Sequence, residues 1–167
     1  MADEVIEVEH PEWIIGIGDP GSATWKDQKF SDENRLRIRC HDVQILPCAD
    51  QYTPPSKEFV EQIIGFARRH LGKNGLIHCY AGQSRSVGTA LIVACVNNPE
   101  GIRGTTFQTR QLSGWANPNR VMIRLADDLL GMNGELIAAV HLMGRRIAKG
   151  VIGFSLYPYD ALFCLWD

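Results

Sequence analysis

The sequence predicts an α/β protein: a single domain in which a central, mostly parallel sheet is flanked by helices. Short apolar segments of strand type alternate along the chain with longer segments whose apolar residues recur at helical spacing. This alternation is typical of parallel strands joined by crossover helices. The chain has 167 residues, which is enough to enclose one hydrophobic core without disulfides or metal ions. We therefore treat residues 1–167 as one domain.

Two strand-like segments and one helix-like segment occupy the first half of the chain. Residues 13–17 form a short apolar run that ends at a Gly-Asp-Pro-Gly turn, and residues 36–40 alternate apolar and polar side chains as a half-buried strand does. Residues 53–56 offer turn and N-cap chemistry. They precede a helix predicted over residues 59–71, where apolar side chains recur at helical spacing until Gly72 ends the pattern.

The second half of the chain contains one more strand and three helices. Residues 75–78 form an apolar strand, and residues 87–96 follow without a charge on any face. The uncharged segment is predicted to be the buried central helix. Further helices are predicted at residues 119–130 and 135–149. The side chains expected to face the core from these two helices are Leu125, Leu129, Ile137 and Val140.

The two ends of the chain are expected to behave differently. Residues 1–11 are acidic and are predicted to be a flexible N-terminal segment. Residues 150–167 are rich in apolar and aromatic side chains, so we expect this tail to pack on the domain. A dimer contact and a wall of a substrate site are the alternatives for the tail.

The composition is that of an ordinary globular protein. Hydrophobic residues make up 45% and charged residues 22% of the chain, and the formal net charge is −2. A slightly acidic chain has no basic field that would attract nucleic acid or an anionic membrane. No apolar run is as long as a membrane span, and the N-terminus lacks the apolar core of a signal peptide. These observations predict a cytoplasmic protein with no nucleic-acid or membrane partner.

The five cysteines and five histidines lack metal-binding spacing. The cysteines are odd in number and contain no Cys-x-x-Cys pair; they are Cys40, Cys48, Cys79, Cys95 and Cys164. This pattern indicates neither a disulfide framework nor a zinc site, and reduced thiols are typical of intracellular proteins. We therefore expect no metal ion and no cofactor.

The most informative segment lies between the third strand and the central helix. Its sequence is His78-Cys79-Tyr80-Ala81-Gly82-Gln83-Ser84-Arg85-Ser86. Ligands of parallel sheets bind at the carboxyl ends of the strands, where Cys79 is expected. Successive N–H groups of such a loop can form a nest for phosphate, and the helix N-terminus that follows favours an anion. Arg85 can fork onto two phosphate oxygens, and the positive environment stabilises the thiolate, which is the attacking form.

This segment resembles the active-site loop of the cysteine-dependent protein tyrosine phosphatases, His-Cys-x-x-Gly-x-x-Arg-Ser/Thr. Every fixed position of the motif is occupied, by His78, Cys79, Gly82, Arg85 and Ser86. The Ser-Arg-Ser variant is most similar to the compact dual-specificity branch and its small bacterial and phage relatives. The resemblance implies a protein tyrosine or dual-specificity phosphatase with a phosphocysteine intermediate and no cofactor. Its partners would be phosphorylated proteins or peptides, and phosphate- or sulfate-type anions would bind in the loop.

The resemblance also implies roles for individual residues. Cys79 would be the nucleophile, and Arg85 with Tyr80, Ala81, Gly82, Gln83 and Ser84 would bind the phosphoryl group while His78 orders the loop. The Ser86 hydroxyl would hydrogen-bond the sulfur and steady it as a leaving group. Asn119, in a Pro-Asn pair ahead of the next helix, would brace the loop; a plain helix N-cap is the alternative for this residue.

A phosphatase of this kind needs a general acid that protonates the leaving oxygen and then activates water. The resembled family uses an aspartate from a loop near the end of the strand that precedes the first long helix. Asp42 stands at that place and is the preferred candidate. Asp50 is the alternative, because Pro54 follows it as in the larger tyrosine-specific enzymes and the segment is a few residues longer than in typical dual-specificity enzymes.

The substrate and two other functions complete the sequence-based hypotheses. The variable loop positions carry no Lys or Arg, which favours a singly phosphorylated side chain, Tyr over Ser or Thr, and disfavours phosphoinositides. The first alternative is a non-catalytic module that binds phosphorylated residues. Such modules usually lack the cysteine or the arginine of the motif, and both are present here. A redox-regulated thiol protein is the second alternative, with Cys40 or Cys48 forming a disulfide with oxidised Cys79.

Overall fold

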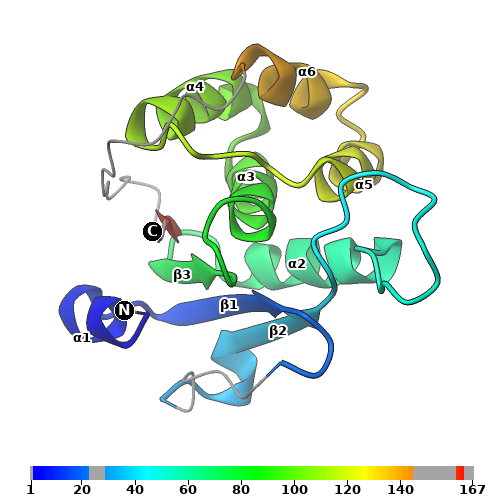
Figure 1. Cartoon of the computed structure of the whole chain (residues 1–167). Helices are drawn as coiled ribbons and strands as arrows, with labels where there is room; N and C mark the ends of the chain where they lie inside the picture. The colour runs from blue at the N-terminus through cyan, green and yellow to red at the C-terminus, as the bar shows by residue number, and fades with distance from the viewer. Residues whose placement is uncertain (1, 23–28, 145–160, 164–167) are drawn as a thin grey trace.

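The structure, a computed structural model, describes residues 2–22, 29–144 and 161–163 of the chain. Its centre is a sheet of four parallel strands in the order β2-β1-β3-β4 (Figure 1). The strands are β1 (Trp13–Gly18), β2 (Arg35–Arg39), β3 (Gly75–His78) and β4 (Ala161–Phe163). The fold class predicted from the sequence is therefore confirmed.

Helices cover this sheet and extend above it (Figure 1). They are α1 (Ala2–Glu9), α2 (Lys57–Arg69), α3 (Arg85–Asn97), α4 (Ile102–Leu112), α5 (Arg120–Leu130) and α6 (Glu135–Leu142), with 3₁₀ helices η1 (Asp32–Asn34) and η2 (Pro99–Gly101). Helices α2, α3 and α5 lie where the spacing of apolar residues predicted them. Helix α6 begins as predicted, and residues 145–149 of that predicted helix lie outside the described residues.

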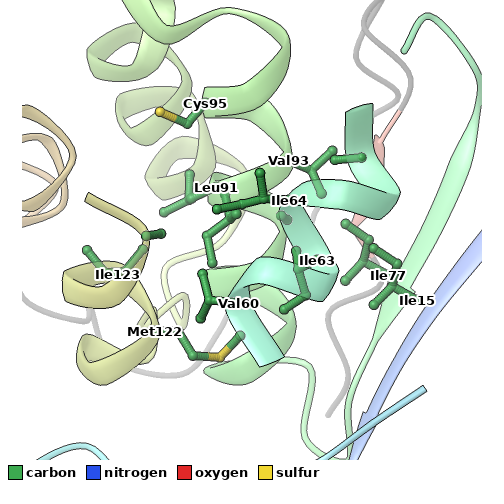
Figure 2. Packing of buried hydrophobic residues seen from close by; sticks show 14 of the residues in the cluster. Ile15, Val60, Ile63, Ile64, Ile77, Leu91, Val93, Cys95, Met122 and Ile123 are labelled. Atoms are coloured by element: carbon green, nitrogen blue, oxygen red, sulfur yellow. The ribbon is translucent and has the colours of Figure 1, made fainter. Parts of the chain in front are cut away.

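Helix α3 lies at the centre of the core, as its lack of charge predicts. It packs against α2, α4, α5 and the sheet. Figure 2 shows the side chains that meet there: Leu91, Val93 and Cys95 from α3, Val60, Ile63 and Ile64 from α2, Met122 and Ile123 from α5, and Ile15 and Ile77 from the sheet. Burial on all sides fixes α3 firmly, so the loop that enters its N-terminus has a rigid support.

Helix α4 is absent from the sequence-based prediction. Its only large apolar residues are Ile102, Phe107 and Leu112, too few to give a helical pattern. Threonine replaces apolar residues on its buried face, and the Thr106 and Thr109 hydroxyls donate to carbonyl oxygens one turn earlier, at 2.9 and 2.8 Å. Because these hydroxyls are satisfied within the helix, their burial does not leave an unpaired polar group.

The N-terminal segment, which is expected to be flexible, contains a helix. Residues Ala2–Glu9 form helix α1, and the buried Ile6 packs with Ile14 of β1 and Leu76 of β3. This contact covers the face of the sheet that the other helices leave open. At the other end, Ala161–Phe163 pair with β3 as strand β4, and the rest of the predicted tail, residues 150–167, lies outside the described residues.

The prediction that Ile137 faces the core was wrong. Ile137 is exposed, and Leu136 and Ala139 are the buried residues of α6. The apolar run from Leu136 to Val140 is continuous, so spacing alone does not indicate which face is inward. The contacts of the preceding turn decide the face instead.

A buried carboxylate holds α6 in place. Asp127 of α5 accepts hydrogen bonds from the Gly134 N–H at 2.6 Å, the Leu136 N–H at 2.9 Å and the Ile137 N–H at 3.2 Å. We expect Asp127→Ala to lower the free energy of unfolding by about 3 kcal/mol, because buried N–H groups lose their acceptor. Urea denaturation measures this, with Asp128→Ala as the exposed neighbouring control. Equal stability of the two variants would contradict the capping role.

Two buried thiols predict a loss of stability in alkaline solution. Burial raises the pKa of Cys40 and of Cys95 from 9.0 to about 11. The unfolded chain ionises first, so the stability from each neutral thiol is present below pH 9 and disappears as the pH approaches 11. We expect roughly 2–3 kcal/mol per thiol over this window. Denaturation across the window should show a shallower pH dependence in Cys95→Ala, and an unchanged slope would contradict this.

Candidate active site

The ends of three parallel strands gather the candidate residues at one edge of the sheet. The last residue of β2, Arg39, pairs with the last residue of β1, Gly18, and the last residue of β3, His78, pairs with Gly16 of β1. The Cys40 N–H donates to the Gly18 carbonyl at 2.9 Å. Asp19, Cys40 and Cys79 are the first residues after these three strands. The edge is therefore the carboxyl end of the sheet, where parallel α/β proteins bind ligands.

The loop from Cys79 to Ser84 connects β3 to α3 over this edge (Figure 1). Cys79 is buried, and its Sγ lies 3.2 Å from the Ser86 Oγ in a hydrogen bond. Gly82 has a φ of +65°, a left-handed conformation that favours glycine in a tight loop. The Gln83 carbonyl accepts from the Asn117 N–H at 2.9 Å. The loop thus holds a thiol beside a hydroxyl in a constrained backbone.

The Arg85 side chain is buried at this edge of the sheet, and one of its N–H donors lacks a hydrogen-bond partner among the described residues. Its side chain is 6% exposed, and Nη1 donates to Asp19 Oδ1 and to the Cys40 carbonyl, each at 2.6 Å. Its Nε is buried and has no hydrogen-bond partner within the described residues. An unpaired buried donor on a cation is unfavourable. An oxyanion bound against this guanidinium would satisfy it.

Asp42 joins the loop to two other segments. Its Oδ1 accepts from Ser84 Oγ at 2.6 Å, from Asn119 Nδ2 at 2.7 Å and from Gln44 Nε2 at 3.1 Å. Gln44 Nε2 also lies 2.6 Å from Ser84 Oγ, and Gln44 Oε1 accepts from the Arg120 N–H at 3.0 Å. Figure 1 shows the segment after β2, in cyan, extending toward α5 before it turns back to α2. The network fixes that segment against the loop.

Asn119 both contacts the loop segment and caps helix α5, the two alternatives that the sequence left open for it. Its Nδ2 donates to Asp42 and to the Val43 carbonyl at 3.0 Å, and its main-chain N–H donates to the Ser84 carbonyl at 3.2 Å. Its Oδ1 accepts from the Met122 N–H at 3.0 Å as the N-cap of α5. One fully buried side chain therefore caps a helix and ties the loop to the Asp42 segment.

The other candidates lie around this network with fewer contacts. Asp50 is exposed, and the Ser84 side chain of the loop is hydrogen-bonded to Asp42 and Gln44 instead. His78 is half-buried at the end of β3. The Tyr52 ring meets the His41 ring edge-on at a centroid distance of 5.4 Å. Tyr52 is partly exposed, and Tyr80 of the loop is 90% exposed.

The cysteines named for a redox role differ in exposure. Cys40, Cys48, Cys79 and Cys95 are free in the described part of the chain, and Cys164 lies outside it. Cys40 is fully buried, whereas Cys48 is half-buried. The pKa of the Cys40 thiol is raised to about 11 by burial, so Cys40 is a thiol, and a weak nucleophile, near neutral pH.

Sequence reasoning missed two residues of this site. Asp19 was read as part of a turn, although it directly follows a strand beside β3 and so lies at the ligand-binding edge of a parallel sheet. This position becomes a signal only when the order of the strands in the sheet is known. Gln44 carries no sequence signal, because an amide in a polar loop matches no motif.

Metal-binding clusters and membrane-spanning helices are both absent from the described part of the chain. No group of three or more His, Cys, Asp and Glu side chains there is arranged to hold a metal ion. None of the described helices has the length and apolar character needed to cross a membrane.

Comparison with known proteins identifies the fold. No protein-family model matches the sequence, and no curated protein matches it. Among 9 matching solved chains is the crystal structure of DUSP15, a dual-specificity phosphatase, with a TM-score of 0.51 over 89% of this chain and 86% of that chain. The chain has the fold of a dual-specificity phosphatase. The sequence identity is 20%, so the likeness extends to the fold and leaves activity to be argued from the residues.

The groups at this edge of the sheet are suited to nucleophilic attack on the phosphorus of a bound phosphate ester. The Cys79 thiol is hydrogen-bonded to the Ser86 hydroxyl, and the Arg85 Nε has no hydrogen-bond partner among the described residues. The variable positions of the loop carry no charge. A carboxylate borders the loop through Ser84. A thiol, a guanidinium and a carboxylate are groups that can act chemically as a nucleophile, a positive charge for an oxyanion and a proton donor.

Proposed function

We propose that this protein is a cysteine-dependent phosphatase that hydrolyses phosphotyrosine in proteins or peptides through a phosphocysteine intermediate. The observation that carries the proposal is that one short loop holds both the buried Cys79 thiol and the buried Arg85 guanidinium, whose Nε lacks a hydrogen-bond partner among the described residues. Arg85 uses Nη1 for protein contacts. Nε and Nη2 present the parallel N–H groups of the other edge, the geometry that matches two phosphate oxygens.

In the first step the Cys79 thiolate attacks phosphorus. The S–P bond forms as the bond from phosphorus to the tyrosyl oxygen breaks, and the leaving oxygen takes the electron pair and a proton from Asp42. Arg85 and the loop N–H groups hold the equatorial oxygens, whose charge the fixed donors stabilise. No metal ion takes part in this scheme.

In the second step water attacks the phosphocysteine. The Asp42 carboxylate accepts a proton from this water, the new P–O bond forms, and the S–P bond breaks with the electron pair returning to sulfur. The Ser86 hydroxyl, 3.2 Å from Sγ, then donates to the departing thiolate. Inorganic phosphate leaves, and the enzyme is restored.

The contacts of Asp42 support this residue over Asp50 as the general acid. The donors from Ser84, Asn119 and Gln44 all bind Oδ1, which leaves Oδ2 to carry the transferred proton. The side chain is exposed at the border of the loop, where a leaving group would emerge. Asp50 is also exposed, but the Ser84 hydroxyl of the loop donates to Asp42 and not to Asp50.

Two substitutions decide between these carboxylates. We expect Asp42→Asn to lower kcat for a phosphotyrosine peptide by about 10²–10³-fold and to flatten the basic limb of its pH profile. The asparagine Oδ1 can still accept hydrogen bonds from Ser84 and Gln44. The variant therefore removes the transferable proton and keeps these contacts to the loop. Steady-state kinetics across pH measure the effect, with Asp50→Asn as the control. A flattened basic limb in Asp50→Asn alone would transfer the role to Asp50.

The rim of the loop supports a phosphotyrosine substrate. Tyr80 of the loop is exposed, and so is Ile45, which follows Gln44, a residue that contacts the loop. The exposed Tyr52 packs on His41, which precedes Asp42 in the chain. The variable loop positions carry no Lys or Arg. A flat aromatic side chain carrying one phosphate fits this combination. Within the superfamily, the Ser-Arg-Ser pattern supports the compact branch with bacterial and phage relatives, and the free thiols support a cytoplasmic location.

Phosphate release in the presence of EDTA tests the proposed function. The wild-type protein is expected to hydrolyse a phosphotyrosine peptide with EDTA present and to prefer it to a phosphoserine peptide of the same sequence. Loss of turnover with EDTA would contradict the metal-free mechanism, and a preference for phosphoserine would contradict the substrate assignment.

A further inference from the structure

We propose that Asp19 is a positioning residue that orients Arg85 for phosphate, a role that rests on the proposed function. Asp19 Oδ1 lies 2.6 Å from Arg85 Nη1, and the two side chains are 51% and 6% exposed. An arginine side chain has many rotamers, and a phosphate site needs one of them. The pair thus joins a buried cation of the active-site loop to a carboxylate on a different strand end.

Two acceptors hold the same nitrogen from different segments. Nη1 donates to Asp19 after β1 and to the Cys40 carbonyl after β2. Because the guanidinium is planar, fixing Nη1 at two points fixes the whole group. The opposite edge, which includes the unpaired Nε, is then free for the oxyanion without competing for protein acceptors.

The turn after β1 keeps the Asp19 carboxylate in place. The Ser22 N–H donates to the Asp19 carbonyl at 3.0 Å, Pro20 occupies the second position, and Gly21 has a φ of +80°. These are the features of a type II turn. Arg39 Nη1 donates to the Ser22 carbonyl at 3.1 Å, which ties the turn to β2. The acceptor for Arg85 is therefore preorganised by the backbone.

The charge of Asp19 also suits this place. A buried guanidinium without a counter-ion is strongly unfavourable, and the Cys40 carbonyl supplies a dipole only. Half of the Asp19 side chain faces solvent, so pairing requires little desolvation of the carboxylate, and water screens its repulsion of an incoming phosphate. Asp19 thus stabilises the oriented cation before the substrate arrives.

Kinetics and vanadate inhibition of Asp19→Ala and Asp19→Asn test this inference. We expect Asp19→Ala to lower kcat/KM for the phosphotyrosine peptide by about ten- to a hundredfold and to raise the inhibition constant of vanadate, a mimic of the transition state, by a similar factor. Asp19→Asn keeps an oxygen acceptor but loses the negative charge, so it is expected to recover only part of both losses. The inhibition constant is a property of active molecules alone, so a loss of folded protein would leave it unchanged.

Asp32→Ala is the matched control. Asp32 also pairs with an arginine, Arg35, on a surface where the aspartate side chain is 90% exposed, and the variant should match the wild type.

Normal kcat/KM and vanadate inhibition in Asp19→Ala would overturn the positioning role and leave the phosphatase function intact. If the wild type has no turnover, the phosphatase function fails, and calorimetry with inorganic phosphate still decides on Asp19. Equal affinity in wild type and Asp19→Ala overturns the inference, and weaker binding in the variant supports it.

Discussion

Replacing Cys79 with serine is expected to abolish turnover of phosphotyrosine peptides. A serine hydroxyl is a far weaker nucleophile than a thiolate at neutral pH, and the hydroxyl beside this position, Ser86, is no base. Removal of an attacking group typically lowers kcat by at least about 10⁴-fold. Single-turnover kinetics with excess enzyme measure the chemical step directly.

The Cys79→Ser variant should still bind its substrate, because Arg85 and the loop backbone remain. Calorimetry with the phosphotyrosine peptide measures this binding, and Cys95→Ser, at another buried free thiol, is the control that should retain activity. Full turnover in Cys79→Ser would contradict the nucleophile assignment. Binding of the peptide by a wild-type protein that shows no turnover would favour a non-catalytic binding module.

Replacing Arg85 with lysine is expected to lower kcat/KM by about 10²–10³-fold. Lysine keeps the positive charge, but a single ammonium group cannot contact Asp19, the Cys40 carbonyl and two phosphate oxygens in the geometry of the guanidinium. Steady-state kinetics with the phosphotyrosine peptide measure the loss. Because lysine keeps the charge of arginine, a loss of kcat/KM in this variant reports the geometry of the guanidinium donors.

Arg110→Lys is the matched control for Arg85→Lys. Arg110 is also buried, and it donates to main-chain carbonyls of Ser113, Gly114, Met143 and Gly144. Its replacement should lower thermal stability and leave kcat/KM per folded molecule unchanged. Near wild-type kcat/KM in Arg85→Lys would contradict the role of the guanidinium as the phosphate clamp.

The sequence was sufficient where the signal is local. The apolar run that leads into Cys79 and the uncharged helix that follows it predicted β3, α3 and the loop between them. Helix α4 escaped prediction because buried threonines replace apolar residues there, and the inward face of α6 was misassigned because its apolar run is continuous. Local periodicity indicates an element reliably only when its buried face is distinctly apolar.

The candidate site was predictable in its motif and less so in its contacts. Arg85 and Asp19 are 66 positions apart, and Asn119 and Asp42 are 77 positions apart. Such pairs depend on the order of strands and on the path of the segment after β2, which no short-range pattern encodes. Asp42 and Asn119 were nevertheless named from the resemblance, whereas Asp19 required the sheet order to be known.

The most direct test of the central claim is detection of phosphocysteine during turnover. The enzyme is mixed with a phosphotyrosine peptide, stopped in denaturant within the first turnover, digested and analysed by mass spectrometry. We expect one phosphoryl group on Cys79, formed and lost at rates that match turnover, and none in Cys79→Ser. Steady turnover with no phosphoryl group on Cys79, or with the group on another residue, would rule out a phosphocysteine intermediate at Cys79.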